Sequence, residues 1–186
     1  MSGLKRIAVL LILPISALLC GAAIADEPAQ CPDWMKYKLG KLHSSDTLDL
    51  CALSAGKPVL IVNTASHCGY TRQFTGLEAL HQRYRDRGLV VIGFPSNSFN
   101  QEARSAEKTA EVCYKNYGVT FAMTEAVPVR GAQAHPVFRH LSNASEEPGW
   151  NFNKFLVSAD GLQVQHFGSG VEPESSALRA AIEQAL

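Results

Sequence analysis

The chain has no excess of charge of either sign, since its 186 residues include 17 Lys and Arg against 17 Asp and Glu. It also has no internal repeat, no low-complexity tract and no long linker. A net charge near zero gives no electrostatic reason to expect a nucleic acid or an anionic membrane surface as a partner. The absence of repeats and linkers argues against repeat architectures and predicts one globular catalytic or binding domain.

Two patterns of cysteine chemistry are also missing. The chain has no Cys-x-x-Cys pair, because Thr71 stands three residues after Cys68, and thiol–disulfide oxidoreductases depend on such a pair. A copper-binding module could use Cys68 with His67 and His135, but no cysteine pair and no methionine cluster supports soft-metal ligation. We therefore expect neither a metal nor a cofactor.

The N-terminal residues have the pattern of a cleaved export signal. Lys5 and Arg6 form a short positive region, and the uncharged stretch 7–25 follows. Small residues at Ala23 and Ala25 suit a signal peptidase. We therefore expect residues 1–25 to be a signal peptide, a mature chain of net charge −2, and a periplasmic location without stable membrane association.

Two alternatives to a cleaved signal remain open. An uncleaved anchor would rely on the densest apolar part, Ile7–Leu19, which is short for a bilayer span of about 20 residues. A lipoprotein would carry its lipid on Cys20, but Leu19 stands where such signals normally have a small residue.

The predicted mature chain contains four cysteines, Cys31, Cys51, Cys68 and Cys113. An exported protein meets an oxidising compartment, so disulfides are permitted, and four cysteines allow three complete pairings. Cys31 and Cys51 lie in a polar N-terminal extension, residues 26–56. A bond between them would close a loop of about 20 residues and contribute about 3 kcal/mol in the chain-entropy model.

The remaining chain, residues 57–186, alternates between short apolar runs and helical periodicity. Continuous β-branched runs are typical of strands buried on both faces, and apolar residues spaced by three and four are typical of helices. The expected strands cover 57–65, 89–94, 155–158 and 164–167, and the expected helices cover 71–86, 105–117, 134–141 and 173–186. This order predicts an α/β fold, a thioredoxin-like sandwich with a central mixed β-sheet covered by helices.

Cys68 stands where the first of these strands turns into a helix. Unpaired backbone N–H groups and the positive end of the helix dipole both favour a thiolate at such a turn. The alternative is a small buried hydrophobic residue, against which the polar Ser66 and His67 and the following Gly69 argue. Cys68 is therefore the candidate nucleophile.

Three ordered motifs resemble those of the glutathione peroxidase family. Residues 63–71 (NTASHCGYT) are similar to its active-cysteine motif, residues 93–102 (GFPSNSFNQE) to its second motif and residues 150–157 (WNFNKFLV) to its third. Further similarity covers residues 117–121 and 131–136, so that the resemblance extends from about Leu42 to Leu186.

The resemblance implies a catalytic tetrad at Cys68, Gln101, Trp150 and Asn151. Peroxide reduction requires a thiolate that attacks one oxygen while a proton reaches the departing one. The two amides and the indole N–H can donate hydrogen bonds to the sulfur and to the developing oxyanion without carrying a charge that would repel either.

The chain departs from the family's pattern at several positions. Ser96 and Ser98 replace a cysteine and a glutamine of the second motif, and that loop has one residue fewer before Gln101. Ala122 replaces a proline. Cys68 replaces the selenocysteine of other members, which implies slower chemistry because less of a thiol is ionised.

Cys113 lies in residues 111–121, a stretch that resembles members reduced by thioredoxin. The resemblance implies that Cys113 resolves the Cys68 sulfenic acid by forming a Cys68–Cys113 disulfide. We expect the helix around Cys113 to unwind partly for this step. The alternative is an inert cysteine that faces the core.

The sequence as a whole therefore predicts a thiol peroxidase that reduces hydrogen peroxide and organic hydroperoxides in the response to oxidative stress. A thioredoxin-like protein or glutathione would recycle it. The connection from Leu141 to Trp150 is short, which favours a monomer. A thiol-based redox sensor and a thiol–disulfide oxidoreductase on the same fold are the alternatives.

Overall fold

The computed structural model describes residues 31–186. The predicted signal peptide, its cleavage point after Ala25 and Cys20 lie outside the described residues. No helix within 31–186 combines the length and the apolar content needed to cross a membrane.

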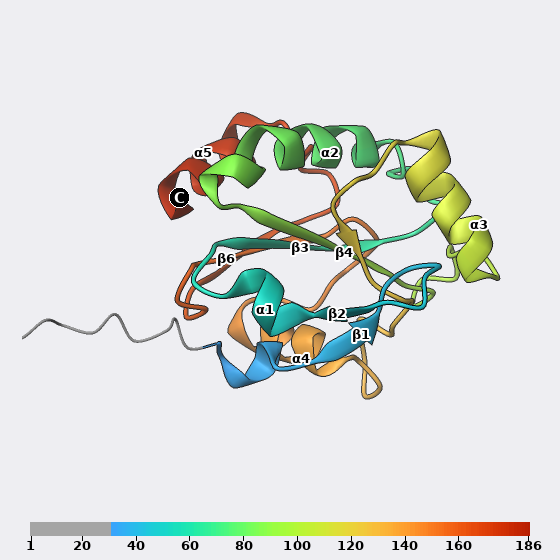
Figure 1. Cartoon of the computed structure of the whole chain (residues 1–186), viewed down its shortest axis with the longest axis horizontal. Coiled ribbons are helices and arrows are strands. Elements are labelled where there is room, and N and C mark those ends of the chain that lie inside the picture. The colour runs from blue at the N-terminus through green and yellow to red at the C-terminus, as the bar shows by residue number, and fades with distance from the viewer. Residues whose placement is uncertain (1–30) are drawn as a thin grey trace, which may run out of the picture.

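A five-stranded mixed sheet forms the centre of the domain (Figure 1). Its strands, in spatial order, are β5 (Ala122–Met123), β4 (Val90–Pro95), β3 (Val59–Thr64), β6 (Lys154–Val157) and β7 (Val164–Phe167). β3 pairs in parallel with β4, and β4 pairs in parallel with β5. β6 runs antiparallel to both β3 and β7. The two parallel pairs and two antiparallel pairs make the sheet mixed, as the sequence predicted.

Alternating side chains of β3 divide the core between the two faces of this sheet. Leu60 and Val62 belong to one buried cluster, and Val59 and Ile61 belong to the other. All six residues of β3 are buried. The strand therefore reads as a continuous apolar run because helices cover both of its faces.

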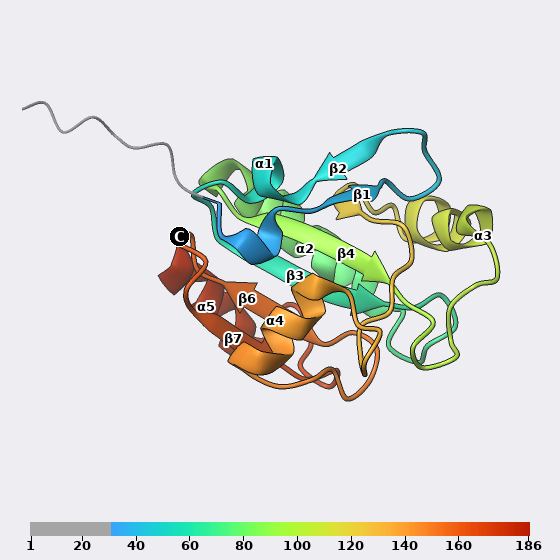
Figure 2. The ribbon, with the colours of Figure 1, turned by 90° about the horizontal axis from the view of Figure 1, so that it is seen from below.

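Helices lie on both sides of the sheet (Figures 1 and 2). α2 (Gln73–Tyr84) and α5 (Ser176–Ala185) cover one face, and α4 (Pro136–Ala144) and the 3₁₀ turn η1 (Asp33–Met35) cover the other. α3 (Ala106–Ala110) continues directly into a π-helix, η3 (Glu111–Asn116), at one end of the sheet. A second 3₁₀ turn, η2 (Arg85–Arg87), follows α2 and ends at Gly88. The φ of Gly88 is 107°, a value that glycine adopts readily and other residues rarely do.

Several short elements were not expected from the sequence. β1 (Lys38–Gly40) and β2 (Thr47–Asp49) form an antiparallel hairpin in the N-terminal extension, and α1 (Leu50–Ser54) follows it. The hairpin contacts the edge of the main sheet, where Leu42 N donates to Met123 O at 2.9 Å. Each of the two strands has three residues, so their periodicity is too brief to detect.

Three expected helix starts were wrong. α4 begins at Pro136 rather than Ala134, because the His135 ring nitrogen accepts a hydrogen bond from Val137 N at 3.3 Å and caps the helix there. α5 begins at Ser176 rather than Pro173, because the Ser175 side chain accepts a hydrogen bond from Leu178 N and caps the helix there. α2 begins at Gln73 rather than Thr71, after a series of tight turns.

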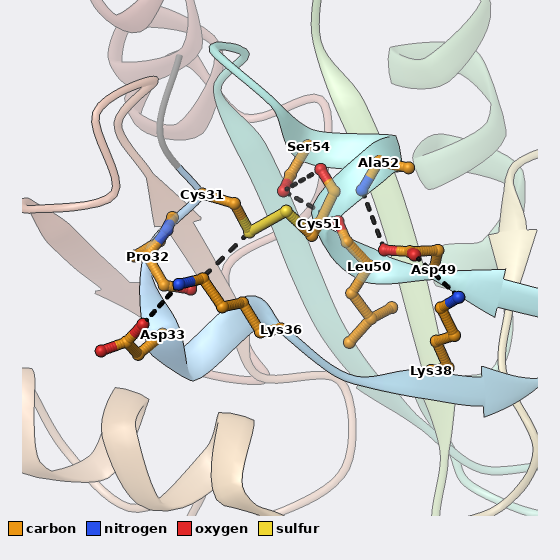
Figure 3. The surroundings of a disulfide bond; sticks show 10 residues. All are labelled: Cys31, Pro32, Asp33, Lys36, Lys38, Asp49, Leu50, Cys51, Ala52 and Ser54. Carbon is orange, nitrogen blue, oxygen red and sulfur yellow. Dashed lines mark hydrogen bonds and ion pairs between the residues drawn. A yellow bond between two sulfur atoms is a disulfide. The ribbon is translucent and has the colours of Figure 1, made fainter. Parts of the chain in front are cut away.

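The structure confirms the disulfide between Cys31 and Cys51 (Figure 3). Their Cα atoms are 5.5 Å apart. The bond attaches the start of the described chain to α1, directly before β3. Cys68 and Cys113 are free thiols and both are buried. The structural bridge is thus separate from Cys68 and Cys113.

Candidate active site

Three loops that carry the predicted site residues meet at one edge of the sheet. Cys68 follows the carboxyl end of β3, and Gln101 follows the carboxyl end of the parallel strand β4. Trp150 and Asn151 precede β6. Because β6 is antiparallel to β3, its amino end lies at the same edge, as the pairing of Val62 with Lys154 shows.

Cys68 lies in a turn whose backbone is fixed by hydrogen bonds. Its N–H donates to Thr71 Oγ1 at 3.1 Å, and the Thr71 hydroxyl donates to Ala65 O at 2.9 Å. The thiol receives one backbone hydrogen bond, from Tyr70 N to Sγ at 3.4 Å. Since α2 begins five residues later, this local N–H, rather than the first helical turn, is the donor closest in sequence to the sulfur. Cys68 is 8% exposed, so a small molecule needs only a small opening to reach it.

The Gln101 loop is joined directly to the Cys68 turn. His67 N donates to the Gln101 carbonyl oxygen at 2.9 Å. The Gln101 side chain accepts a hydrogen bond from Asn151 Nδ2 to its Oε1 at 3.2 Å. An amide whose oxygen is occupied in this way keeps its N–H₂ group available as a donor. The structure therefore brings Gln101 and Asn151 together beside the loop of Cys68.

Asn151 is fully buried, and its Oδ1 atom has no hydrogen-bond partner in the described structure. Its backbone is held by Ser169, whose hydroxyl donates to Asn151 O at 2.6 Å. A buried acceptor without a partner is costly unless a ligand completes it. The Asn151 amide thus offers an oxygen as well as the Nδ2 donor.

Trp150 lies at the surface beside these groups. The residue is 39% exposed, and its ring contacts the ring of Phe99 with centroids 5.2 Å apart. Its carbonyl oxygen accepts from Asn63 Nδ2 at 2.9 Å and from Asn153 Nδ2 at 2.7 Å. Between residues 31 and 186, no hydrogen bond joins Trp150, Gln101 or Asn151 to the Cys68 sulfur. A substrate would therefore have to bridge the donors and the thiol.

The shortened loop before Gln101 is held by the two serines that depart from the family's pattern. The Ser96 hydroxyl donates to Ser98 Oγ at 3.1 Å, and Ser98 Oγ accepts from Val129 N at 3.1 Å. Asn100 adopts the left-handed conformation at φ 56°, which asparagine tolerates well. These contacts hold the loop that leads to Gln101.

A buried lysine, Lys154, contacts Ser169, the residue that holds the backbone of Asn151, and its role was not predicted from the sequence. Lys154 Nζ donates to Gln73 Oε1 at 2.5 Å, to Val171 O at 2.6 Å and to Ser169 O at 3.4 Å. It is fully buried, and burial lowers the pKa of its ammonium to about 8. Lys154 stands within the third motif, WNFNKFLV, so its position was visible but its role was not.

Cys113 lies in the π-helix η3 with 1% of its surface exposed. Burial, with a smaller contribution from the Glu102 carboxylate, raises the pKa of the Cys113 thiol to about 12. Cys113 and Cys68 belong to the same buried cluster, although they form no bond to each other. The expected helix is present, and its last part has the wider π geometry, which is common at functional sites.

No group of three or more His, Cys, Asp or Glu residues in the described part of the chain is arranged to hold a metal ion. The site residues that meet at the sheet edge are a thiol, two amides and an indole. These groups are typical of a thiol-based redox enzyme, in which a cysteine sulfur is the reacting atom.

Comparisons with known proteins agree with that class. A profile of the glutathione peroxidase family matches residues 40–142, which is more than half of the chain. The glutathione peroxidase-like peroxiredoxin gpx1 of Schizosaccharomyces pombe is 47% identical over 125 residues, which cover 64% of this chain and 79% of that protein.

Solved structures share the fold. The crystal structure of Trgpx in apo form is 31% identical, with a TM-score of 0.63, and the match covers 82% of this chain and 94% of that one. A thiol:disulfide interchange protein of the thioredoxin family from Chlorobium tepidum has a TM-score of 0.62. Its match covers 87% of this chain and 98% of that one, and at 15% identity it shows the fold alone.

The chain has the thioredoxin-like fold and belongs to the glutathione peroxidase family. It is a thiol-dependent peroxidase. The family profile ends before Trp150 and Asn151. The assignment of the third motif therefore rests on its sequence and on the contact between Asn151 and Gln101.

Proposed function

We propose that Cys68 is the peroxidatic thiol and that Gln101, Trp150 and Asn151 are its hydrogen-bond donors. The observation that carries this assignment is the Asn151–Gln101 amide pair, attached through His67 to the Cys68 turn. Three loops from distant parts of the sequence converge there, and none of the three donors carries a charge.

The first chemical step is a displacement on oxygen. The Cys68 thiolate forms an S–O bond with one peroxide oxygen, and the O–O bond breaks. The departing oxygen takes a proton and leaves as water or an alcohol, and Cys68 becomes a sulfenic acid. Neutral N–H donors stabilise the negative charge on the departing oxygen without repelling the incoming thiolate. The buried Asn151 Oδ1 can accept the hydrogen bond of the peroxide hydroxyl.

A Cys68→Ser variant tests the nucleophile. We expect a folded protein that no longer consumes peroxide, because a serine hydroxyl is not a competent nucleophile at neutral pH. Circular dichroism verifies the fold, and peroxide consumption is followed with an added dithiol. Turnover close to that of the wild type in a folded variant would overturn the assignment. The double variant Cys31→Ser/Cys51→Ser is the control, since it replaces cysteines outside the site and leaves no new free thiol.

The second proposed step uses Cys113 as the resolving thiol. Its sulfur displaces water from the Cys68 sulfenic acid, and a Cys68–Cys113 disulfide and one molecule of water result. Support comes from the free thiol of Cys113, its place in the same buried cluster as Cys68 and the π-helix that carries it. Peptide mapping after one equivalent of peroxide should show this disulfide, with Cys31–Cys51 unchanged. A bond from Cys68 to Cys31 or Cys51 would contradict the assignment.

The proposed reductant is an exported thioredoxin-like protein, acting on a monomeric peroxidase. A protein disulfide between Cys68 and Cys113 calls for a dithiol donor, which reduces it by exchange. Steady-state turnover with a thioredoxin system should exceed turnover with glutathione. Equal or faster turnover with glutathione would identify the monothiol as the donor, and light scattering tests the monomer.

We also propose export with cleavage after Ala25, on the pattern of residues 1–25. The intact mass of protein secreted to the periplasm of a bacterial host should correspond to a chain that begins at Asp26. A retained Met1 or a lipid on Cys20 would contradict it.

A further inference from the structure

Glu102 connects the Cys68 turn to the segment that carries Cys113. Its Oε1 atom accepts hydrogen bonds from the hydroxyl of Ser66, from Ala103 N at 2.7 Å and from the hydroxyl of Thr109 at 3.0 Å. Ser66 stands two residues before Cys68, and Thr109 lies on α3, one turn before Cys113. One carboxylate oxygen therefore joins the two redox elements.

The side chains on both sides of this connection are buried. Ser66 is 8% exposed and Thr109 is 3% exposed. Glu102 itself is anchored by its backbone, because Glu102 N donates to Asn97 Oδ1 at 3.2 Å. Hydrogen bonds to a carboxylate are among the stronger ones, so this contact favours the packed arrangement of residues 106–116, which we call the Cys113 segment.

The packed arrangement does not form the disulfide. Both cysteines are free thiols in this arrangement, and they lie on two separate elements, the Cys68 turn and η3. The second Glu102 oxygen, Oε2, is buried without a hydrogen-bond partner. Its negative charge adds to burial in keeping Cys113 protonated. While the Cys113 segment stays packed, its thiol is a weak nucleophile.

We propose that Glu102 is a positioning residue that holds the Cys113 segment against the Cys68 turn and so sets the rate of Cys68–Cys113 disulfide formation. This inference rests on the proposed resolving role of Cys113. When the contact between Thr109 and Glu102 is released, α3 and η3 can unwind. The Cys113 thiol then moves away from the negative charge of the Glu102 carboxylate. The part of the segment that carries Cys113 is the π-helix η3, a rare geometry that is found frequently at functional sites.

The consequence is a competition at the Cys68 sulfenic acid. In one reaction the Cys113 sulfur attacks the sulfenic sulfur, the S–O bond breaks, and the oxygen leaves as water. In the other, a second peroxide molecule oxidises the sulfenic acid to sulfinic acid and is itself reduced to water or an alcohol. A tightly held Cys113 segment prolongs the life of the sulfenic acid and raises the sulfinic fraction.

Thr109→Val tests the proposal because it removes the hydroxyl, which is shared between Glu102 Oε1 at 3.0 Å and Ser105 O at 3.2 Å, keeps the side-chain shape and leaves the Ser66 contact in place. Stopped-flow fluorescence with one equivalent of peroxide separates Cys68 oxidation from disulfide formation. We expect the oxidation rate to stay within about twofold, and the disulfide rate to rise about tenfold, the change expected for the loss of one hydrogen bond to a charged group. The sulfinic fraction at excess peroxide, measured by mass spectrometry, should fall.

Two further variants make the result specific. Glu102→Gln keeps an amide oxygen at the same place but removes the charge, and it should also speed disulfide formation. Ser158→Ala removes a hydroxyl–carboxylate hydrogen bond, to Asp160, from the β6–β7 turn and should change neither rate. Hydrogen exchange of the amides of residues 106–116 should accelerate in Thr109→Val and not in Ser158→Ala, which confirms that the protein is folded and that the opening is local.

An unchanged or slower disulfide rate in both Thr109→Val and Glu102→Gln would overturn the role of Glu102 while the wild type still forms the Cys68–Cys113 disulfide. If the wild type forms no such disulfide, Cys113 is not the resolving cysteine, and the proposed role of Glu102 is then wrong as well. The two failures are therefore distinguished by peptide mapping of the wild type alone.

Discussion

Replacing Lys154 with methionine should change how the stability of this protein depends on pH. The ammonium of Lys154 is fully buried between β6, the start of α2 and the turn at residues 169–171. Burial lowers its pKa from 10.5 to about 8, and this effect is larger than the attraction to Glu172. Methionine has a similar length and is apolar, so it fills the site without a charge.

The sign follows from proton binding. In the folded protein Lys154 loses its proton near pH 8, whereas in the unfolded chain it keeps the proton to about pH 10.5. Between these values the unfolded chain binds more protons, so the free energy of unfolding rises with pH. A shift of this size corresponds to about 3 kcal/mol over the whole window, and to about 1.3 kcal/mol between pH 7 and pH 9.

Cys113 acts in the opposite sense at the upper end of this range. Its folded pKa of about 12 lies above the ordinary thiol value of 9.0, so from about pH 9 the unfolded chain loses a proton that the folded protein keeps. Stability then falls with rising pH. Both wild type and Lys154→Met contain Cys113, so its contribution cancels in their difference.

The assay is urea unfolding of the two proteins at pH 7, 8 and 9. The difference in unfolding free energy, wild type minus variant, should increase by about 1.3 kcal/mol across the series. Lys57→Met, on an exposed side chain, should show no such trend relative to the wild type. A difference that stays constant with pH, with unchanged m-values, would show that Lys154 remains charged inside the fold and would refute the reasoning.

Three other predictions concern the donors, the histidines and the disulfide. Gln101→Ala or Asn151→Ala should slow the oxidation of Cys68 by peroxide about 10- to 1,000-fold, which is the range for the loss of one oxyanion donor. Unchanged stopped-flow rates in both variants would contradict the assignment of these donors. Burial lowers the pKa values of four histidines, so the unfolded chain takes up protons before the folded protein does as pH falls below about 6.5. The melting temperature measured by calorimetry should therefore drop between pH 7.5 and 5.5, and an unchanged value would exclude this origin. The four are His81, His135, His140 and His166. Cys51→Ser should lower the unfolding free energy in urea by about 3 kcal/mol, and equal stability of the two proteins would show that the bond contributes nothing.

The elements of the main sheet were predictable because each apolar run is long enough to show its character. β3, β4, β6 and β7 all lie within a residue or two of the expected strands. β5 was missed since it contains only two residues, and its place at the sheet edge is set by pairing with β4 rather than by its own sequence. Such pairing is a long-range property that no local pattern records.

The π-helix shows a different limit. Residues 105–117 have helical periodicity, and Ser105 caps the segment as expected. The change from α3 to η3 at Glu111 depends on how Cys113 packs into the core, since hydrophobic periodicity does not distinguish the two geometries. The position of Cys113 was thus predicted, but the wider turns around it were not.

The site could be predicted as a set of motifs but not as an arrangement. Sequence similarity placed Cys68, Gln101 and Asn151 in three separate motifs. Their meeting at one edge depends on β6 running antiparallel to β3, which the order of motifs along the chain does not determine. The supporting roles of Glu102 and Lys154 were missed for the same reason, because each contacts residues distant in sequence.

The two charged side chains of this region, the half-buried Glu102 and the buried Lys154, support the loops of the site rather than contribute donors to it. Glu102 holds the Cys68 turn through Ser66, and Lys154 orders the 169–171 turn, where Ser169 holds the backbone of Asn151. A carboxylate next to the peroxide would repel the thiolate, and an ammonium there would change charge near pH 8. Amide and indole N–H groups keep their hydrogens across this range, so the donors stay constant while the charged groups fix the loops that position them.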